Sequence, residues 1–236
     1  RITDPTDEAI RAAATIIRGG GLVAFPTETV YGLGADALNP IACARIFEAK
    51  NRPRFDPLIV HIAQIDQLDD LCTAVDAMAR NLAERFWPGP LTLVLGKSDL
   101  VPEIVTAGLD TVAVRMPAHA VASRLLEGAD TPIAAPSANP FGYISPTTAQ
   151  HVDEQLGERV DMILDGGQCL VGVESSIVDL TAGRPVLLRA GGVSVEDIEA
   201  VVGSVEIGAA SHESLLAPGQ LPHHYSPGTR LVILAS

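Results

Sequence analysis

The run Lys50-Asn51-Arg52-Pro53-Arg54-Phe55-Asp56-Pro57-Leu58-Ile59-Val60-His61 joins a cluster of cations to a short apolar segment. Three of the chain's 16 Lys and Arg residues fall within 50–54, although the formal net charge of the chain is −13. The prolines stiffen the turn, and the apolar residues 58–62 predict a buried strand. Cations in a rigid loop at the mouth of a strand can bind an anion, so we predict that this loop holds a nucleotide triphosphate.

Length and composition place this loop in a globular α/β protein. The 236 residues suit one large domain with the beginning of a second, and 47% of them are apolar, which argues against disorder. No stretch approaches the roughly 20 apolar residues of a membrane span, and the first residues lack the pattern of a signal peptide. We therefore expect a cytoplasmic protein with no membrane contact, although a segment before residue 1 could have been removed.

The charge balance and the cysteines exclude several kinds of site. An acidic chain does not bind nucleic acid or anionic membranes strongly by bulk charge, so an anionic ligand must meet a local cationic pocket. Cys43, Cys72 and Cys169 are far apart and predict buried or half-buried thiols rather than a disulfide framework or a zinc site.

Segments on either side of the opening run alternate between helical and extended periodicity, which predicts an α/β fold. Asp4 and Pro5 predict the start of the first helix, and Ser145 predicts the cap of a later one. Helices are expected at 5–18, 39–50, 65–86 (as two helices), 119–126, 147–156 and 194–202, and strands at 22–25, 91–95, 111–115, 132–135, 176–179 and 186–189.

Polar loops follow several of these strands and supply the candidate binding groups. The loop 26–34 carries hydroxyls, a phenol and glycines, and the loop 137–139 carries Ser-Ala-Asn between prolines. Open α/β sheets place ligands at such strand ends. P-loop, zinc-protease and serine-hydrolase motifs do not occur, and Gly19-Gly20-Gly21 precedes a strand instead of following one, so it is not a dinucleotide fingerprint. The inventory suits phosphate and carboxylate recognition with electrostatic catalysis.

The composition changes near residue 208 and predicts a domain boundary. We expect a catalytic domain over 1–207, a linker over 208–229, and the start of a further domain over 230–236. The adjacent His223 and His224 lack a third ligand at useful spacing, so a surface position is favoured over a metal site.

Several separated motifs, in order, resemble the YrdC family of threonylcarbamoyl-AMP synthases. They are Pro-Thr-Glu-Thr-Val-Tyr-Gly-Leu (26–33), Lys-Asn-Arg-Pro (50–53) with Pro-Leu-Ile-Val-His (57–61), Ser-Ala-Asn (137–139) and Leu-Arg-Ala-Gly (188–191). The resemblance spans about residues 6 to 203, and 218–227 is similar to the linker of the long form, which leads to a small Rossmann-like domain. It implies a twisted mixed sheet flanked by helices around a deep cationic cleft. At Asp56 the family more often has an amide such as Asn.

The resemblance also implies an activity. The family condenses L-threonine, bicarbonate and ATP to threonylcarbamoyl-adenylate and pyrophosphate, and a downstream transferase complex uses the product to modify adenosine in tRNA. Mg²⁺ is expected to arrive with ATP, without protein ligands of its own. Two alternatives stay open from the residues: an RNA-binding module that uses the cleft, and a nucleotide-binding relative with another carbamoyl-transfer reaction.

Site residues follow from the resemblance position by position. Lys50 and Arg52 are expected to be catalytic through the ATP phosphates. The residues expected on the nucleotide side are Lys50, Arg52, Asp56, Thr111, Ser137, Asn139, Ser145, Arg189, His224 and Tyr225. Those expected to hold threonine are Thr29, Tyr31, His61, Arg115, Ala135 and Ser175.

Overall fold

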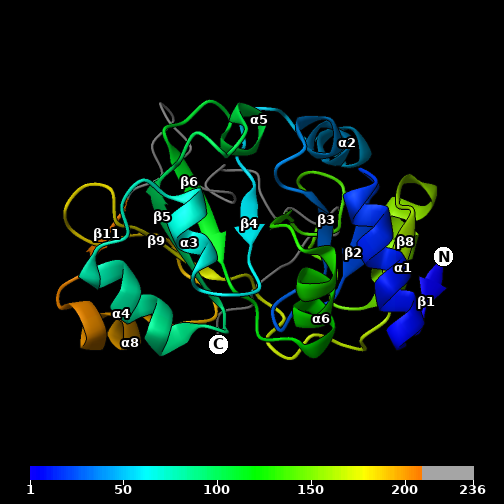
Figure 1. Cartoon of the computed structure of the whole chain (residues 1–236). Helices are drawn as coiled ribbons and strands as arrows, with labels where there is room; N and C mark the ends of the chain where they lie inside the picture. The colour runs from blue at the N-terminus through cyan, green and yellow to red at the C-terminus, as the bar shows by residue number, and fades with distance from the viewer. Residues whose placement is uncertain (209–236) are drawn as a thin grey trace, which may run out of the picture.

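A computed structural model describes residues 1–208 of the chain, which form a mixed α/β fold (Figure 1). Strands and helices alternate along the sequence, as the periodicity predicts. In chain order they are β1 (Ile2–Thr3), α1 (Asp7–Arg18), β2 (Val23–Phe25), β3 (Gly32–Asp36), α2 (Pro40–Lys50), β4 (Ile59–His61), α3 (Gln67–Leu71), α4 (Ala77–Phe86), β5 (Leu91–Gly96), α5 (Glu103–Thr106), β6 (Thr111–Arg115), α6 (Ala120–Ala129), β7 (Ile133–Ala134), α7 (Ala149–Leu156), a 3₁₀ turn (Gly157–Arg159), β8 (Met162–Leu164), β9 (Ser176–Asp179), β10 (Val186–Arg189), α8 (Val195–Val202) and β11 (Glu206–Ile207).

The strands of this region form one mixed sheet in the order β1-β8-β2-β3-β7-β4-β6-β5-β9-β10-β11. Near its middle, β4 and β6 run parallel, with His61 opposite Arg115. Strand β5 pairs antiparallel with β6 and parallel with β9. This order brings segments far apart in the sequence side by side, so the ends of β4, β6 and β10 can contribute to one site.

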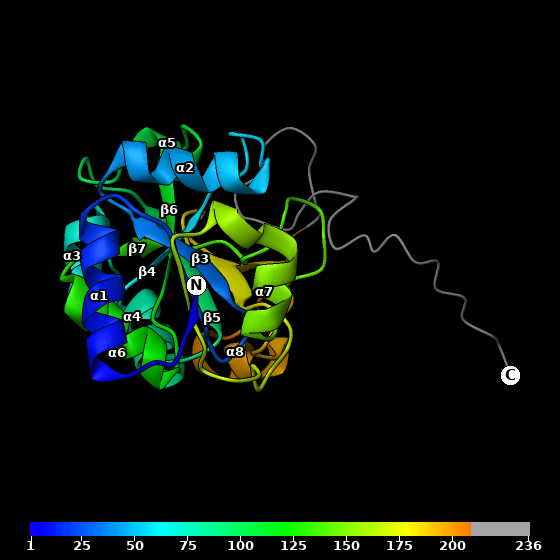
Figure 2. The same cartoon turned by 90° about the vertical axis from the view of Figure 1, so that its right-hand side faces the viewer.

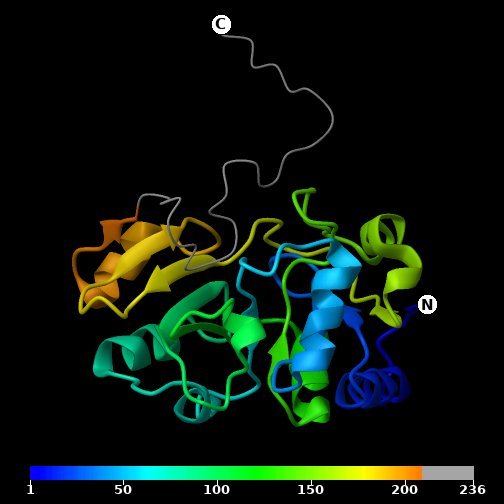
Figure 3. The same ribbon diagram turned by 90° about the horizontal axis from the view of Figure 1, so that it is seen from above.

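Helices cover the sheet on both faces (Figure 2). α1 and α6 pack against each other, and α7 lies on the opposite side of β2 and β8. Buried side chains between the α1–α6 pair and the sheet include Ile10, Ile17 and Leu125. A second helix pair, α4 and α8, lies at the other end of the sheet (Figure 3). Burial of these apolar faces on both sides of the sheet is the main stabilising term of the fold.

Helix starts show where local signals predict structure well. The side chain of Asn39 accepts from the backbone N–H groups of Ile41 and Ala42, with Pro40 in the first turn, as predicted. The first helix differs from the prediction: Thr6, not Asp4, is its N-cap and accepts from the N–H of Ala9. Asp4 instead accepts the N–H of Thr6 through its carbonyl, because a turn precedes the helix.

The second difference concerns the helix α7. Its N-cap is Thr148, whose side chain accepts from the N–H of His151, so the prediction of a Ser145 cap is wrong. Ser145 instead donates its hydroxyl proton to Glu174, far away in the sequence. Ser145 and Thr148 both lie near the start of the helix. The hydroxyl of Ser145 is bonded to the distant carboxylate of Glu174, and Thr148 caps the helix.

Strand β3 was not predicted, since its glycines suggested a turn. It lies between β2 and β7, where space is short. A Cβ atom on Gly34 would lie 2.7 Å from Phe25 Cε1 and 2.8 Å from Ile133 Cγ2. Gly34 is therefore needed for close packing against a buried ring, not for a turn.

Two further predictions concern burial and membranes. Cys43, Cys72 and Cys169 are free and buried, as predicted. Among residues 1–208, none of the helices combines the length and the apolar character needed to cross a bilayer. The predicted linker beyond residue 208 and the predicted strand at 230–236 lie outside the described residues.

Candidate functional site

A pocket opens where the ends of several strands meet. Hydroxyls, three arginines, one histidine and one carboxylate line it, so it can recognise anions. Its lining residues are Thr27, Thr29, Val30, Gly32, Arg52, Ile59, His61, Arg115, Ala135, Pro136, Ser137, Glu174, Ser175 and Arg189. They come from the β2–β3 loop and the first residue of β3, the loop before β4, strand β4 itself, the last residues of β6 and β10, and the segments after β7 and before β9.

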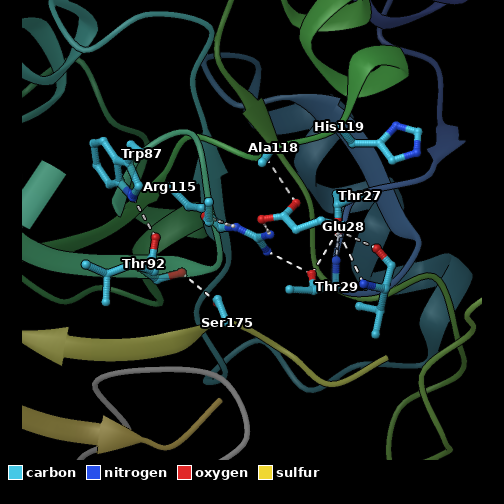
Figure 4. Close-up of polar contacts among 12 residues, drawn as sticks. Thr27, Glu28, Thr29, Trp87, Thr92, Arg115, Ala118, His119 and Ser175 are labelled. Atoms are coloured by element: carbon cyan, nitrogen blue, oxygen red, sulfur yellow. Dashed lines mark hydrogen bonds and ion pairs between the residues drawn. The ribbon is translucent and has the colours of Figure 1, made fainter. Parts of the chain in front are cut away.

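The β2–β3 loop forms one wall and is held by its own hydroxyls (Figure 4). Thr27 Oγ1 lies 2.8 Å from Thr29 Oγ1 and donates to the carbonyl of Val30 at 2.7 Å. Both threonines are buried, and the bonds fix the orientation of their side chains. Thr29 therefore presents its hydroxyl in a preset position.

Arg115 lies at the centre of this wall with its donors directed by three partners (Figure 4). Its Nη2 forms an ion pair with Glu28 Oε1 at 2.6 Å, and its Nη1 donates to Thr29 Oγ1 at 3.0 Å. Its Nε donates to the carbonyl of Gly89 at 3.2 Å. Burial lowers the pKa of Arg115, and the Glu28 carboxylate opposes that shift, so the guanidinium keeps its charge.

The side chain of Glu28, the acid partner of Arg115, is also held in place. Glu28 Oε2 accepts from the backbone N–H of Ala118 at 3.1 Å. The corner that supplies the Gly89 carbonyl is tied down by Trp87, whose indole N–H donates to Leu91 O at 2.7 Å. Arg115 is therefore held from both sides, and its orientation does not depend on a ligand.

His61 contributes a neutral ring to the pocket. It is 3% exposed, and its ring meets Phe25 edge-to-face with centroids 6.2 Å apart. Burial, followed by repulsion from Arg115, lowers its pKa to about 3. Near neutral pH this histidine is a hydrogen-bonding group rather than a cation.

Arg52 provides a second buried arginine–carboxylate pair. Its Nη2 lies 2.9 Å from Asp56 Oδ2, and its guanidinium also donates to the carbonyls of Asp56 and Pro57. Burial raises the pKa of Asp56, against the opposing effects of Arg52 and Lys50. The loop 51–57 thus holds a carboxylate beside its arginine.

Lys50 lies beneath the neighbouring loop rather than in the lining. Its ammonium group is buried and donates to the carbonyls of Ser137 and Asn139. Burial, then repulsion from Arg52, lowers its pKa. In this geometry Lys50 shapes the Ser-Ala-Asn loop that lines the pocket.

The opposite wall is built around Ser175 (Figure 4). Ser175 Oγ lies 2.7 Å from Thr92 Oγ1. Arg189 donates from Nη2 to the Ser175 carbonyl at 2.9 Å and to Ser175 Oγ at 3.1 Å. This wall therefore positions one hydroxyl and one arginine together.

The structure brings half of the predicted site residues into the lining. These are Thr29, Arg52, His61, Arg115, Ala135, Ser137, Ser175 and Arg189. Other predicted site residues among the described ones do not line it, namely Tyr31, Lys50, Asp56, Thr111, Asn139 and Ser145. His224 and Tyr225 lie outside the described residues. The roles of all these residues in binding remain predictions.

Two of the supporting residues have clear structural partners. The Tyr31 hydroxyl donates to Gly167 O at 2.8 Å and accepts from Gly166 N–H, which ties the β2–β3 loop to the turn after β8. The amide of Asn139 donates to the carbonyls of Pro140 and Tyr143 and so closes the following turn. Both residues shape loops of the pocket in this structure.

Sequence reasoning missed Glu28 and Glu174. Glu28 stands between two threonines in the Pro-Thr-Glu-Thr motif, and Glu174 precedes Ser175 directly. In an acidic chain a single Glu carries no signal of its own. Its position inside a polar strand-end motif is the feature that points to the site.

Comparisons with known proteins agree with this geometry. The Sua5/YciO/YrdC family model, described as "Telomere recombination", matches residues 15–191, and a model described as the C-terminal domain of threonylcarbamoyl-AMP synthase matches 193–236. The threonylcarbamoyl-AMP synthase of Pyrococcus abyssi is 54% identical over 229 residues, which cover 95% of this chain and 67% of that protein. The one of Bacillus subtilis is 48% identical over 231 residues, covering 96% and 67%.

A solved structure also matches. The crystal structure of P. abyssi Sua5 complexed with L-threonine superposes with a TM-score of 0.92 at 54% identity, covering 94% of this chain and 66% of that chain. The chain therefore spans about two thirds of the length of the relatives it matches. By its motifs, its fold and these matches, the chain belongs to the Sua5/YciO/YrdC family of threonylcarbamoyl-AMP synthases.

Proposed function

We propose that this chain condenses L-threonine, bicarbonate and ATP to threonylcarbamoyl-adenylate, releasing pyrophosphate, for the modification of tRNA. The single observation that carries the proposal is the convergence of Arg115, Thr29, Arg52 and Arg189 on one pocket. Membership of an ATP-using synthase family and the relative solved with L-threonine support it.

Arg115 is suited to the carboxylate of threonine. Three of its five N–H donors have partners within residues 1–208, which leaves two for a ligand. A planar guanidinium with a fixed orientation binds a carboxylate with geometric specificity. Thr29, Ser175 and the neutral His61 line the same pocket and supply hydrogen bonds around the amino acid.

The nucleotide belongs beside Arg52, Arg189 and Ser137. The amine of threonine and bicarbonate form a carbamate with loss of water, and a carbamate oxygen then attacks the α-phosphate and displaces pyrophosphate. These anions repel one another, and a charge pair at 4 Å contributes about 4 kcal/mol at an effective dielectric constant of 20. We infer that cations and positioning, rather than a covalent nucleophile, lower the barrier.

Lys50 has an indirect part in this geometry. It fixes the carbonyls of Ser137 and Asn139, so the loop that meets the nucleotide depends on it. We propose that Lys50 sets this loop and adds positive potential beneath the phosphates. Direct contact with a phosphate requires its side chain to leave these carbonyls.

Mg²⁺ would enter with the nucleotide. Among residues 1–208, no three His, Cys, Asp or Glu side chains are placed to hold an ion together. A site with few protein ligands suits Mg²⁺, which keeps several waters and binds substrate phosphates. The ion would neutralise phosphate charge when bound.

The predicted linker 208–229, with His224 and Tyr225, and the further domain from 230 remain part of the proposal, as does the cytoplasmic location. A separate transferase complex would use the product. The acidic balance argues against strong direct binding of tRNA by this chain.

The test is conversion of ATP to AMP-linked product and pyrophosphate by the 236-residue chain, with each substrate omitted in turn. We expect pyrophosphate release that needs both threonine and bicarbonate. Release that ignores threonine contradicts the proposal and favours another carbamoyl-transfer reaction. Salt-dependent tRNA binding without turnover favours an RNA-binding module instead.

The variant Lys50→Ala sharpens this assay. It removes a buried cation and both of its bonds to the 137–139 loop, so we expect at least a 100-fold loss of product formation. The exposed Lys or Arg residues away from the pocket serve as controls, for example Arg85→Ala, which should leave the rate unchanged within twofold. Full activity of Lys50→Ala would contradict any role of this side chain in catalysis.

A further inference from the structure

Glu174 stands out among the residues that line the pocket. It is the one carboxylate among the described lining residues, beside three arginines. A carboxylate weakens anion binding unless it serves another charge of the ligand. Its presence in a pocket for anions therefore calls for a cationic group on the substrate.

The backbone holds Glu174 between the wall that carries Thr29 and Arg115 and the opposite wall built around Ser175. Just before it, Val171 N–H donates to Glu28 O at 2.8 Å and Gly172 N–H to Thr29 O at 3.0 Å. Its own carbonyl accepts from Gly192 N–H at 3.0 Å. The segment is thus held along the β2–β3 loop on one side and against the turn after β10 on the other.

The side chain is oriented but not neutralised. Ser145 donates its hydroxyl proton to Glu174 Oε1, and within residues 1–208 the carboxylate makes no ion pair. Arg115 pairs with Glu28, and Arg52 pairs with Asp56, so neither ion pair involves Glu174. Among the described residues, the Glu174 carboxylate therefore lines the pocket with only the Ser145 hydroxyl as a side-chain partner.

We propose that Glu174 binds the α-ammonium group of the amino acid while Arg115 binds its carboxylate. The inference rests on the proposed function only in requiring that the substrate be an α-amino acid. The pocket then selects a zwitterion and holds the nitrogen that becomes the carbamate. Ser145, predicted to meet ATP, acts as a positioning residue that orients Glu174.

A binding cycle tests this by calorimetry, with L-threonine and (R)-3-hydroxybutanoate, which lacks only the α-amino group. Glu174→Gln keeps an acceptor for Ser145 and removes the charge. We expect this substitution to weaken the affinity for L-threonine about 10- to 50-fold and to change the affinity for the hydroxy acid less than threefold. Equal weakening of both ligands indicates a structural role and overturns the inference, as does no change in either.

Two further variants keep the test sharp. Ser145→Ala should weaken the affinity for L-threonine by about 2- to 5-fold and leave the affinity for the hydroxy acid unchanged. This variant tests the inference even if Glu174→Gln does not fold. Glu84→Gln, the same chemical change at an exposed site on α4, should alter neither affinity. If the unmodified chain binds no L-threonine, the proposed function fails as well; if it binds and Glu174→Gln is silent, only the inference fails.

Discussion

Two of the arginines that line the pocket form buried ion pairs with carboxylates behind it, and the two pairs differ in what they connect. Arg115 and Glu28 come from distant segments, and Glu28 accepts a second bond from the backbone of Ala118. Arg52 and Asp56 belong to one short loop, and within the described residues the Asp56 carboxylate has no side-chain or backbone partner besides Arg52. The first pair joins two parts of the fold, whereas the second lies within one turn.

The two ion pairs therefore differ in how well their buried polar atoms are satisfied. A buried ion pair repays its desolvation only when the remaining polar atoms are also satisfied. In the Arg115 pair both Glu28 oxygens have a partner, and the pair fixes the orientation of the guanidinium. In the Arg52 pair Asp56 Oδ1 has no partner among the described residues, and the carboxylate offsets part of the positive charge beside the pocket. We expect the first pair to matter for stability and the second for affinity.

Removal of Glu28 should have the largest effect on stability. Glu28→Ala leaves Arg115 buried without its counter-charge, which typically costs about 3–5 kcal/mol of unfolding free energy. Urea denaturation followed by Trp87 fluorescence measures this loss. The exposed pair of Asp7 and Arg124 is the matched control, and Asp7→Ala should cost less than about 1 kcal/mol. Equal losses at both sites would mean that burial does not distinguish them.

The Arg115 side also predicts a pH dependence through His61. Its pKa falls from 6.5 in the unfolded chain to about 3 in the fold, so the unfolded state binds more protons between these values. Stability is therefore lost as pH falls through this window, by about 2–3 kcal/mol between pH 6.5 and 4.5. Urea denaturation at both pH values should show a shallower loss for His61→Gln. Parallel losses for both proteins would show that His61 is protonated in the fold.

The comparison also shows what sequence could predict. Helix α2 with its Asn39 cap and the strands β5 and β6 follow from local spacing, so their prediction was close. Strand β3 could not be found, because its Gly34 is required by Phe25 and Ile133, which reach it only in the folded sheet. Capping by Thr148 instead of Ser145 likewise depends on Glu174.

The residues of the pocket and its surroundings also fall into those that the sequence predicted and those that it did not. Motif resemblance identified Thr29, Ser137 and Arg189, because the residue types of a motif can be read from the sequence without knowledge of the contacts. Glu28 and Glu174 were not predicted, because their place in the site depends on contacts with residues that are distant in the sequence. The opening loop contains both outcomes: Arg52 lines the pocket, whereas Lys50 lies beneath the 137–139 loop. Side-chain direction at a loop depends on tertiary contacts that one sequence does not display.

The smallest stability effect, and the sharpest contrast with Glu28, is expected at Asp56. Asp56→Asn removes the charge but keeps the shape, and the bonds of Arg52 to the carbonyls of Asp56 and Pro57 do not need the side chain. Burial raises the pKa of Asp56, so the fold disfavours its charged form. Unfolding free energy should change by less than about 1 kcal/mol, and it should favour the variant more as pH rises through the pKa of Asp56.

The Asp56→Asn substitution should strengthen the binding of nucleotide. Without the Asp56 charge, Arg52 and Lys50 present a higher positive potential, and a non-hydrolysable ATP analogue should bind about 3- to 10-fold more tightly at low salt. Calorimetry at two salt concentrations measures this, and the gain should shrink at the higher one. Binding that weakens tenfold instead would show that Asp56 holds Arg52 in its productive orientation, and the two buried pairs would then serve the same purpose.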